Sequence, residues 1–362
     1  MIIRLNKKQK EKVQNIFAYK ELSMVTNEVI RDYLQYNSRF IKSAMIKDVL
    51  DMRRGEEEAF YYFLAAYFGD DYFDRLKLME VDPSYPRKIV HLLKTSKYEN
   101  NPYYQRIKIK NLKGKNWTFK YSTYHPYEGF VYKDLDLLGD YYLEVPQIGF
   151  FNKKFTYLEV YQNGSEWMSI TPNEIETMEE AVNAVKGDVV TYGLGLGYFA
   201  YMASLKEEVT SVNVIELDNE VINLFKKNIL PLFENKKKIK IINMDALEYA
   251  KENHNHDYVF IDLWHDARDG LDWYLKLKKL ENDNSKYYYW IERSILTLLR
   301  RAVLIVLEDE MNGVHSNVYG NDEVDILLKA ISNNLKDYKI TSYQHIYDLL
   351  SEESLRNLAK AL

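Results

Sequence analysis

The feature that most constrains the fold is the regular exchange of short apolar runs and amphipathic stretches from residue 187 onward. Strands that alternate with helices pair in parallel through right-handed crossovers. The run at residues 258–261 is apolar throughout, which is typical of a strand covered on both faces of a sheet. We therefore predict an α/β fold with a Rossmann-type doubly wound sheet. Its five expected strands are residues 188–192, 211–216, 239–243, 257–263 and 302–307.

Two other patterns precede this unit. Residues 1–102 carry apolar side chains at helical spacing and are predicted to be helical. Residues 103–170 predict two hairpins, which pair residues 106–110 with 117–121 and residues 155–160 with 167–170. The predicted domains are an N-terminal helical region (1–102), a β-hairpin region (103–170), a Rossmann-type domain (171–345) and a C-terminal helix (346–362).

The composition narrows the class of protein. The 49 basic and 54 acidic residues nearly cancel, which argues against a nucleic-acid partner. Without cysteine, the chain has neither a disulfide nor a thiol nucleophile. Charge begins at Arg4, and no apolar run reaches the roughly 18 residues of a transmembrane helix, so neither a secretory leader nor a membrane span is expected. These observations predict a cytoplasmic protein.

Three glycines stand where the first expected strand turns into a helix, at Gly193, Gly195 and Gly197. Glycine allows a tight turn and lets a ligand approach the bare backbone. Ligands of open α/β sheets bind beyond the carboxyl ends of the strands, where all three glycines are expected. A dinucleotide pattern Gly-x-Gly-x-x-Gly that starts at Gly195 meets Ala200 at its third position, so a dinucleotide is a less favoured ligand.

An acid, Glu216, ends the second expected strand. An ionised carboxylate at that place can accept hydrogen bonds from both hydroxyls of a ribose. Because NAD-binding proteins share this feature, Glu216 indicates an adenosine ligand without specifying the rest of it. The alternative is a strand-end acid that faces solvent.

The Gly-x-Gly-x-Gly spacing, with acids Glu216 and Asp245 after the next two strands, resembles class I S-adenosylmethionine-dependent methyltransferases. The resemblance implies S-adenosylmethionine as cofactor, held at the glycine bend and by Glu216. It also implies that Asp245 receives the adenine amino group and that the backbone amide of Ala246 meets the ring. Asp245 is also suited to cap the helix that follows, and one residue can fill both roles.

The fourth expected strand ends in residues that can carry chemistry. Asp262 is the first candidate for a functional carboxylate, paired with the amino group of the cofactor or of a substrate. Trp264 can face a cationic centre of a substrate through its ring, or belong to the core. His265 can act as a general base near neutral pH, or be a solvent or capping residue. The acids that recur every third residue from Asp266 predict a solvated helix face, and no metal site is expected.

The spermidine synthase branch of these enzymes is also suggested. A hairpin region precedes the Rossmann-type unit, and Asn173-Glu174 stands where that branch carries an acidic pair, which makes Glu174 a candidate substrate contact. The chain departs from several family patterns. Thr191 stands where many methyltransferases have an acid, and Asp262-Leu263-Trp264-His265 replaces the Pro-Pro motif of enzymes that methylate nucleic-acid bases. The paired acidic pattern of polyamine synthases after the fourth strand is not clearly reproduced.

The leading expectation is S-adenosylmethionine-dependent methyl transfer to an unidentified acceptor, a small molecule rather than a nucleic acid. The alternatives are an aminopropyltransferase of the spermidine synthase type and a non-catalytic nucleotide-binding or regulatory protein, since a fold alone does not fix a function. An NAD-dependent oxidoreductase is the weakest candidate. The sequence is compatible with a homo-oligomer. Two further predictions are a lid between Gly313 and Gly320, and no metal bound at His254 and His256.

Overall fold

A computed structural model describes residues 1–362 apart from residues 53–54, 83, 253–254 and 315–318. Residues 315–318 of the predicted lid and His254 lie outside the described residues.

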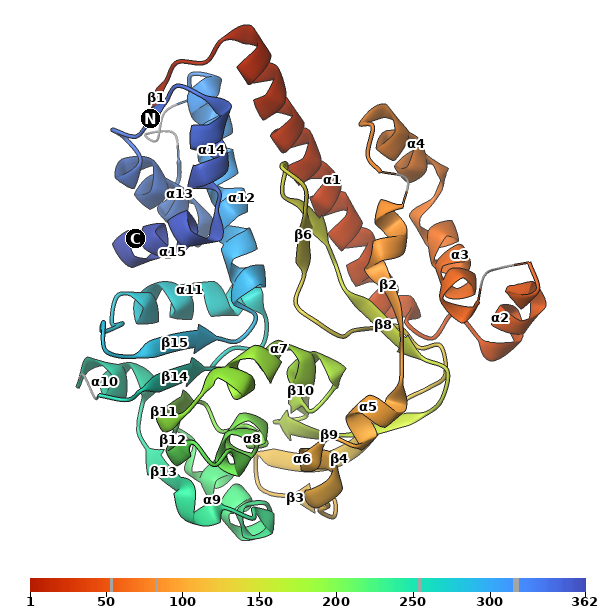
Figure 1. Cartoon of the computed structure of the whole chain (residues 1–362), viewed down its shortest axis with the longest axis vertical. Helices are drawn as coiled ribbons and strands as arrows, with labels where there is room; N and C mark the ends of the chain where they lie inside the picture. Colours follow the sequence, from red (N-terminus) through yellow and green to blue (C-terminus); the bar gives the residue numbers. More distant parts are fainter. Residues whose placement is uncertain (53–54, 83, 253–254, 315–318) are drawn as a thin grey trace.

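Five parallel strands form the central sheet, in the order β13-β12-β11-β14-β15 (Figure 1). The chain runs from β11 outward through β12 to β13, returns to the other side of β11 as β14, and continues to β15. The two middle strands β11 and β14 are almost wholly buried, as their apolar sequences require. The strand bounds are Gly187–Tyr192 (β11), Val209–Glu216 (β12), Ile239–Asn243 (β13), Tyr258–Ile261 (β14) and Lys286–Tyr289 (β15).

The helices of this unit begin where aspartates cap them. Asp218, Asp245 and Asp266 each accept hydrogen bonds from two backbone N–H groups of the first helical turn. Such caps satisfy donors that have no partner within the helix. Asp269 completes a capping box with Asp266, so these two acids organise the start of α11. The helices are α8 (Tyr198–Leu205), α9 (Asn219–Asn228), α10 (Ala246–Lys251) and α11 (Ala267–Lys278).

The predicted fifth strand at residues 302–307 is wrong. These residues lie inside the helix α12 (Glu292–Met311), which buries one broad apolar face. A short apolar run does not distinguish a strand from a buried helix turn, and here the residues on both sides continue the helix. The fifth strand of the sheet is instead β15, which pairs in parallel with β14.

The hairpin region forms a four-stranded antiparallel sheet in the order β10-β9-β4-β3. The second predicted hairpin is confirmed, and its turn residues Asn163 and Gly164 both have positive φ angles, 51° and 87°. The expected strand at residues 106–110 is wrong, because the short helix α6 (Pro102–Arg106) occupies its start and the partner of β4 is residues 112–113. The strands are β3 (Leu112–Lys113), β4 (Trp117–Tyr124), β9 (Phe155–Gln162) and β10 (Ser165–Ser169).

This antiparallel sheet is fastened to the start of α9. Glu220 accepts hydrogen bonds from the backbone N–H groups of Lys115 and Asn116, and Asp218 accepts one from the indole of Trp117 at 3.0 Å. The β3–β4 turn is therefore held beside the end of β12, next to the glycine bend.

The N-terminal part is mainly helical, as predicted, and contains a strand that was not expected. The strand β2 (Val90–Leu93) pairs in parallel with β8 (Ile148–Phe151). Figure 1 shows α1 (Lys7–Asn37) as a long helix that runs from the C-terminal helices to α2 and α3. The remaining elements before β9 are β1 (Ile2–Ile3), α2 (Ser43–Leu50), α3 (Glu56–Phe68), α4 (Asp70–Leu78), η1 (Tyr85–Ile89), α5 (Thr95–Glu99), β5 (Phe130–Val131), β6 (Asp136–Leu138) and β7 (Leu143–Val145).

The chain ends pack together. The strand β1 pairs in parallel with β16 (Lys339–Ile340), and α1 packs against α12 and α14. The large hydrophobic core joins the central parallel sheet, the four-stranded antiparallel sheet and the C-terminal helices. A second core lies under α3 and β8. The predicted domain boundaries stay predictions. The other elements of the chain are α7 (Pro172–Ala184), η2 (Leu230–Leu232), η3 (Lys236–Lys238), α13 (Glu323–Asn334), α14 (Tyr343–Leu349) and α15 (Glu352–Ala361).

Among the described residues, every helix is too short or too polar to cross a lipid bilayer.

Candidate functional site

A cleft of about 1380 Å³ lies at the carboxyl ends of the parallel strands. One wall is made by the loops after β11, β12, β13 and β14, and a second by β10 and the start of α7. The far wall is made by α1 together with residues 131–135 and 146–148. This edge of a parallel sheet is where open α/β folds bind ligands.

The structure brings almost all of the predicted site residues to this one cleft. Gly197 is the exception, and the roles of the others stay predictions. The predicted residues that line the cleft are Glu174, Gly193, Gly195, Glu216, Asp245, Ala246, Asp262, Trp264 and His265.

The three glycines are required for different reasons. A Cβ at Gly193 would collide with the backbone carbonyl of Asp262, and one at Gly197 would collide with the ring of Phe225. Gly197 is thus a packing residue at the start of α8, away from the cleft. A Cβ at Gly195 would meet the sulfur of Met168, a side chain of β10 that lies over the glycine bend. A methionine side chain is flexible, so it can turn aside for a ligand on this backbone.

Glu216 organises the bend. One of its oxygens accepts the N–H of Leu194 at 3.2 Å, and the other accepts the N–H of Asp218 at 2.8 Å. Burial raises the pKa of Glu216, and these hydrogen bonds act against that rise. Each carboxylate oxygen has a second lone pair, so Glu216 can also accept ribose hydroxyls from the cleft.

Asp245 fills the capping role that was its alternative interpretation. Its carboxylate accepts the N–H groups of Leu247 at 2.8 Å and Glu248 at 3.1 Å. Asp245 and Ala246 both line the cleft, so the cap and the predicted adenine contact are compatible.

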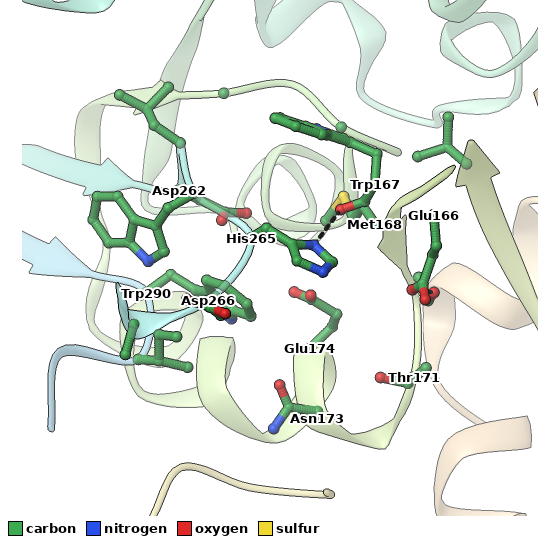
Figure 2. Close-up of a pocket in the computed structure, with 18 of the residues that line it drawn as sticks. Glu166, Trp167, Met168, Thr171, Asn173, Glu174, Asp262, His265, Asp266 and Trp290 are labelled. Atoms are coloured by element: carbon green, nitrogen blue, oxygen red, sulfur yellow. Dashed lines mark hydrogen bonds between the residues drawn. The ribbon is translucent and has the colours of Figure 1, made fainter. Parts of the chain in front are cut away.

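Two acids without hydrogen-bond partners face each other across the cleft. Figure 2 shows the carboxyl groups of Glu174 and Asp262 and the ring of His265 directed into one space. Glu174, in the first turn of α7, is 7% exposed, and its Oε2 has no hydrogen-bond partner among the described residues. Asp262 follows β14, and no hydrogen bond or ion pair from its carboxyl group is found in the same part of the chain.

The pKa values of both carboxyl groups are raised, that of Asp262 by burial and that of Glu174 by burial and by nearby acids. Burial raises the pKa of Asp262 to about 7. Burial, and then the nearby charges of Asp262 and Glu166, raise the pKa of Glu174 well above its usual range. Two carboxyl groups in one poorly solvated space cannot both ionise easily. At neutral pH the pair therefore keeps a proton unless a cation enters the space.

His265 is an exposed residue at the cleft, and its ring contacts the backbone of β10. Its Nδ1 lies 3.2 Å from the backbone carbonyl of Trp167, which can only accept, so Nδ1 carries the proton. In the neutral ring this leaves Nε2 as the acceptor. Trp264 is 5% exposed and stacks near Tyr289, so it belongs to the core as well as to the cleft wall, and its indole N–H has no partner in the described chain.

Sequence analysis missed the contribution of β10 and of the segment before α12. Glu166, Trp167 and Met168 line the cleft opposite Asp262 (Figure 2). Their alternation predicted a hairpin strand but gave no sign of which sheet edge it would face. Trp290 also lines the cleft and donates from its indole to Thr177 at 2.9 Å.

The residues present fit an adenosyl sulfonium ligand. Gly193 and Gly195 line the cleft with backbone, over which the flexible side chain of Met168 lies at Gly195, and Glu216 stands at the next strand end. The orphaned carboxyl oxygen of Glu174 and the partnerless Asp262 are suited to a cationic group.

Comparison with known proteins finds a matching family model and a number of similar solved structures. Residues 201–269 match the model of the spermine/spermidine synthase domain, which covers about a fifth of the chain and includes Glu216, Asp245, Asp262 and His265. The spermidine synthase from Thermotoga maritima is 16% identical with a TM-score of 0.29, covering 36% of this chain and 48% of its own. A spermidine synthase in complex with the transition state analogue AdoDATO is 17% identical with a TM-score of 0.30, covering 39% and 57%.

The chain thus spans about half the length of these two synthases. No curated protein matches the chain.

Proposed function

We propose that this protein transfers an aminopropyl group from a decarboxylated S-adenosylmethionine donor to an amine acceptor. The observation that carries the proposal is the pair of acids Glu174 and Asp262, which share one space without hydrogen-bond partners in the described chain. A protonated amine in that space would satisfy both carboxylates. The match of residues 201–269 to the spermine/spermidine synthase domain supports the same reaction class.

The donor would lie along the carboxyl ends of β11, β12 and β13. Gly193 and Gly195 would meet its adenosyl part, Glu216 its ribose, and Asp245 with Ala246 its adenine. The order of the sheet, with its reversal between β11 and β14, supports a Rossmann-type doubly wound unit for this purpose. The donor supplies an electrophilic carbon, whose bond to sulfur breaks with its electron pair as the new C–N bond forms.

The charge of the cleft favours the decarboxylated donor over S-adenosylmethionine. Among the described residues, nine acidic side chains line the cleft: Asp134, Glu166, Glu174, Glu216, Asp218, Glu220, Asp245, Asp262 and Asp266. Only Arg31 and Lys133 oppose them, and both belong to the far wall. The carboxylate of S-adenosylmethionine would face like charges, which costs several kcal/mol where the groups are desolvated. Methyl transfer, the leading expectation from sequence, is therefore the second candidate.

The chain's own residues handle the acceptor proton. An amine binds as an ammonium ion between Glu174 and Asp262 and must lose one proton before nitrogen can attack. Asp262, with a pKa of about 7, and the Nε2 of His265 are the acceptors within this space. The protein otherwise acts by alignment of nitrogen, carbon and sulfur.

The test is a transfer assay with the full chain. The protein is incubated with decarboxylated S-adenosylmethionine or S-adenosylmethionine and a panel of primary amines, and products are separated by mass spectrometry. We expect an aminopropylated amine and 5′-methylthioadenosine. Asp262→Asn should slow product formation strongly, whereas Asp272→Asn, the same change on the solvent face of α11, should not. A methylated acceptor would establish the second candidate, and tight donor binding without any product would favour a regulatory protein.

A further inference from the structure

The far wall of the cleft differs from the donor side in its chemistry. One face of α1 contributes Asn27, Ile30, Arg31, Leu34 and Gln35, whose spacing of three and four residues brings them to one side of the helix. Two turns of α1 therefore line the cleft. This wall is built by α1 and by residues 131–135 and 146–148, all of which lie outside the segment that matches the synthase domain.

The cations of the cleft are confined to this wall. Arg31 on α1 and Lys133 in residues 131–135 are the two basic residues, other than histidine, among the described lining residues. The acids Glu166, Glu174 and Asp262 stand at the other end, beside the predicted donor site. The cleft is thus acidic at one end and basic at the other.

Both cations are available to a ligand. Arg31 pairs with Glu28 at 3.5 Å and with Asp32 at 3.6 Å, and its side chain is 51% exposed. Lys133 pairs with Asp136 at 3.6 Å, and that acid already accepts a hydrogen bond from Arg293 at 2.7 Å. Loose exposed pairs of this kind contribute little free energy, so exchanging them for a ligand anion costs little.

Among the described residues of the far wall, the acidic one is Asp134, which is hydrogen-bonded to the start of α12. Asp134 accepts hydrogen bonds from the hydroxyl of Ser294 and from the backbone N–H of Arg293, and so caps the start of α12. Its charge is directed to that helix start. It therefore does not neutralise Lys133, with which it shares the wall.

We propose that the acceptor is an ω-amino carboxylate: a chain with a primary amine at one end, held by Glu174 and Asp262, and a carboxylate at the other, held by Arg31 and Lys133. The apolar side chains Ile30 and Leu34 would cover the methylene groups between the two ends. The volume of about 1380 Å³ exceeds that of ordinary small-molecule pockets, roughly 300–1,000 Å³, and leaves room for the donor and an extended acceptor together. The amine end of this inference rests on the proposed function, whereas the carboxylate end rests on the far wall alone.

The experiment compares two compound series that differ at one end. Calorimetry is performed on the full chain with 5′-methylthioadenosine present, using α,ω-diaminoalkanes and ω-amino acids of matched length. We expect the best ω-amino acid to bind about ten-fold more tightly than the matched diamine, as one charge-assisted contact would give. The double variant Arg31→Gln/Lys133→Gln should lose this preference and keep its affinity for diamines. Lys237→Gln, an exposed lysine away from the cleft, is the control.

The outcomes separate this inference from the proposed function. If diamines bind as tightly as ω-amino acids, or if the double variant keeps the preference, the inference is overturned even where aminopropyl transfer is observed. If the tighter binding of ω-amino acids depends on Arg31 and Lys133 but no group is transferred, the inference about the acceptor is supported and the proposed aminopropyl transfer is wrong. If neither series binds, both are wrong.

Discussion

The acids at the two ends of the binding cleft differ in their hydrogen bonding. At the donor end, Glu216 and Asp245 each accept two backbone N–H groups and thereby hold the glycine bend and the start of α10. At the acceptor end, Glu174 and Asp262 share one space, and neither the Oε2 of Glu174 nor the carboxyl of Asp262 has a hydrogen bond within the described chain. The same residue type therefore stabilises the fold in one place and weakens it in the other.

This difference indicates what holds the side chains in place at each end of the cleft. The donor end is preorganised by the chain itself, because its carboxylates already have partners. The acceptor end concentrates negative charge that only a ligand or a proton can neutralise. Removing an acid should therefore have opposite consequences for stability at the two ends, and the following predictions test that contrast.

The largest effect is expected at Asp262. Asp262→Asn removes a proton acceptor next to the predicted amine, so the rate of transfer should fall by about 10²–10⁴-fold. The free energy of unfolding should not fall, since a neutral amide replaces a partnerless acid. Transfer kinetics and chemical denaturation of the same preparation measure both quantities. A variant that loses stability in parallel with activity would show that Asp262 supports the fold.

The glycine bend gives the next largest effect. Gly193 has a φ of 99° and faces the carbonyl of Asp262, so Gly193→Ala should lower the free energy of unfolding by at least about 1–3 kcal/mol. Gly195→Ala is the matched control, because its Cβ meets only the flexible end of Met168. Chemical denaturation should rank Gly193→Ala as the more damaging change, and the reverse order would mean that the close approach to Asp262 is unimportant.

The cap at the donor end has a smaller effect. Asp245→Ala leaves two helix N–H groups of α10 without their acceptor and should cost about 0.5–2 kcal/mol. If Asp245 also contacts adenine, donor affinity should fall as well, whereas Asp245→Asn should restore much of the stability. Unchanged donor affinity in Asp245→Ala would limit the residue to its capping role.

The last effect is a pH dependence of the free energy of unfolding. The folded protein holds the pKa of Asp262 near 7, above that of the unfolded chain, so the folded state binds more protons between about pH 4 and pH 7. The contribution of Asp262 to stability is complete below this window and is lost as the pH rises through it. The melting temperature of Asp262→Asn relative to the original chain should therefore rise across the window. A constant difference would remove Asp262 from the titrating groups.

Sequence reasoning located the donor end better than the acceptor end. The strands β11 to β14 and the glycine bend follow from local apolar patterns and from the glycines between them, and these signals are contiguous in the chain. The strand β15 was not predicted, because Lys286 and three tyrosines form an edge strand without a clear polar–apolar alternation. The apolar run at residues 302–307 fits either a strand or a buried helix, and only the packing of α12 decides between them.

The acceptor end depends on distant parts of the chain. Glu166 comes from a hairpin, Arg31 from α1, and Lys133 from the segment after β5. No spacing in the sequence relates these residues to Asp262, because tertiary packing alone brings them to one cleft. Glu174 was found only through its place before the glycine bend, and its pairing with Asp262 required the structure.

The central claim is that Glu174 and Asp262 together receive a protonated amine. Titration calorimetry of one acceptor amine at neutral pH, repeated in buffers of different ionisation enthalpy, measures the protons that are released on binding. We predict proton release by the original chain, because the bound cation drives the shared proton off the pair, and none by Glu174→Gln/Asp262→Asn. Binding without proton release, or equal affinity in the double variant, would contradict the claim.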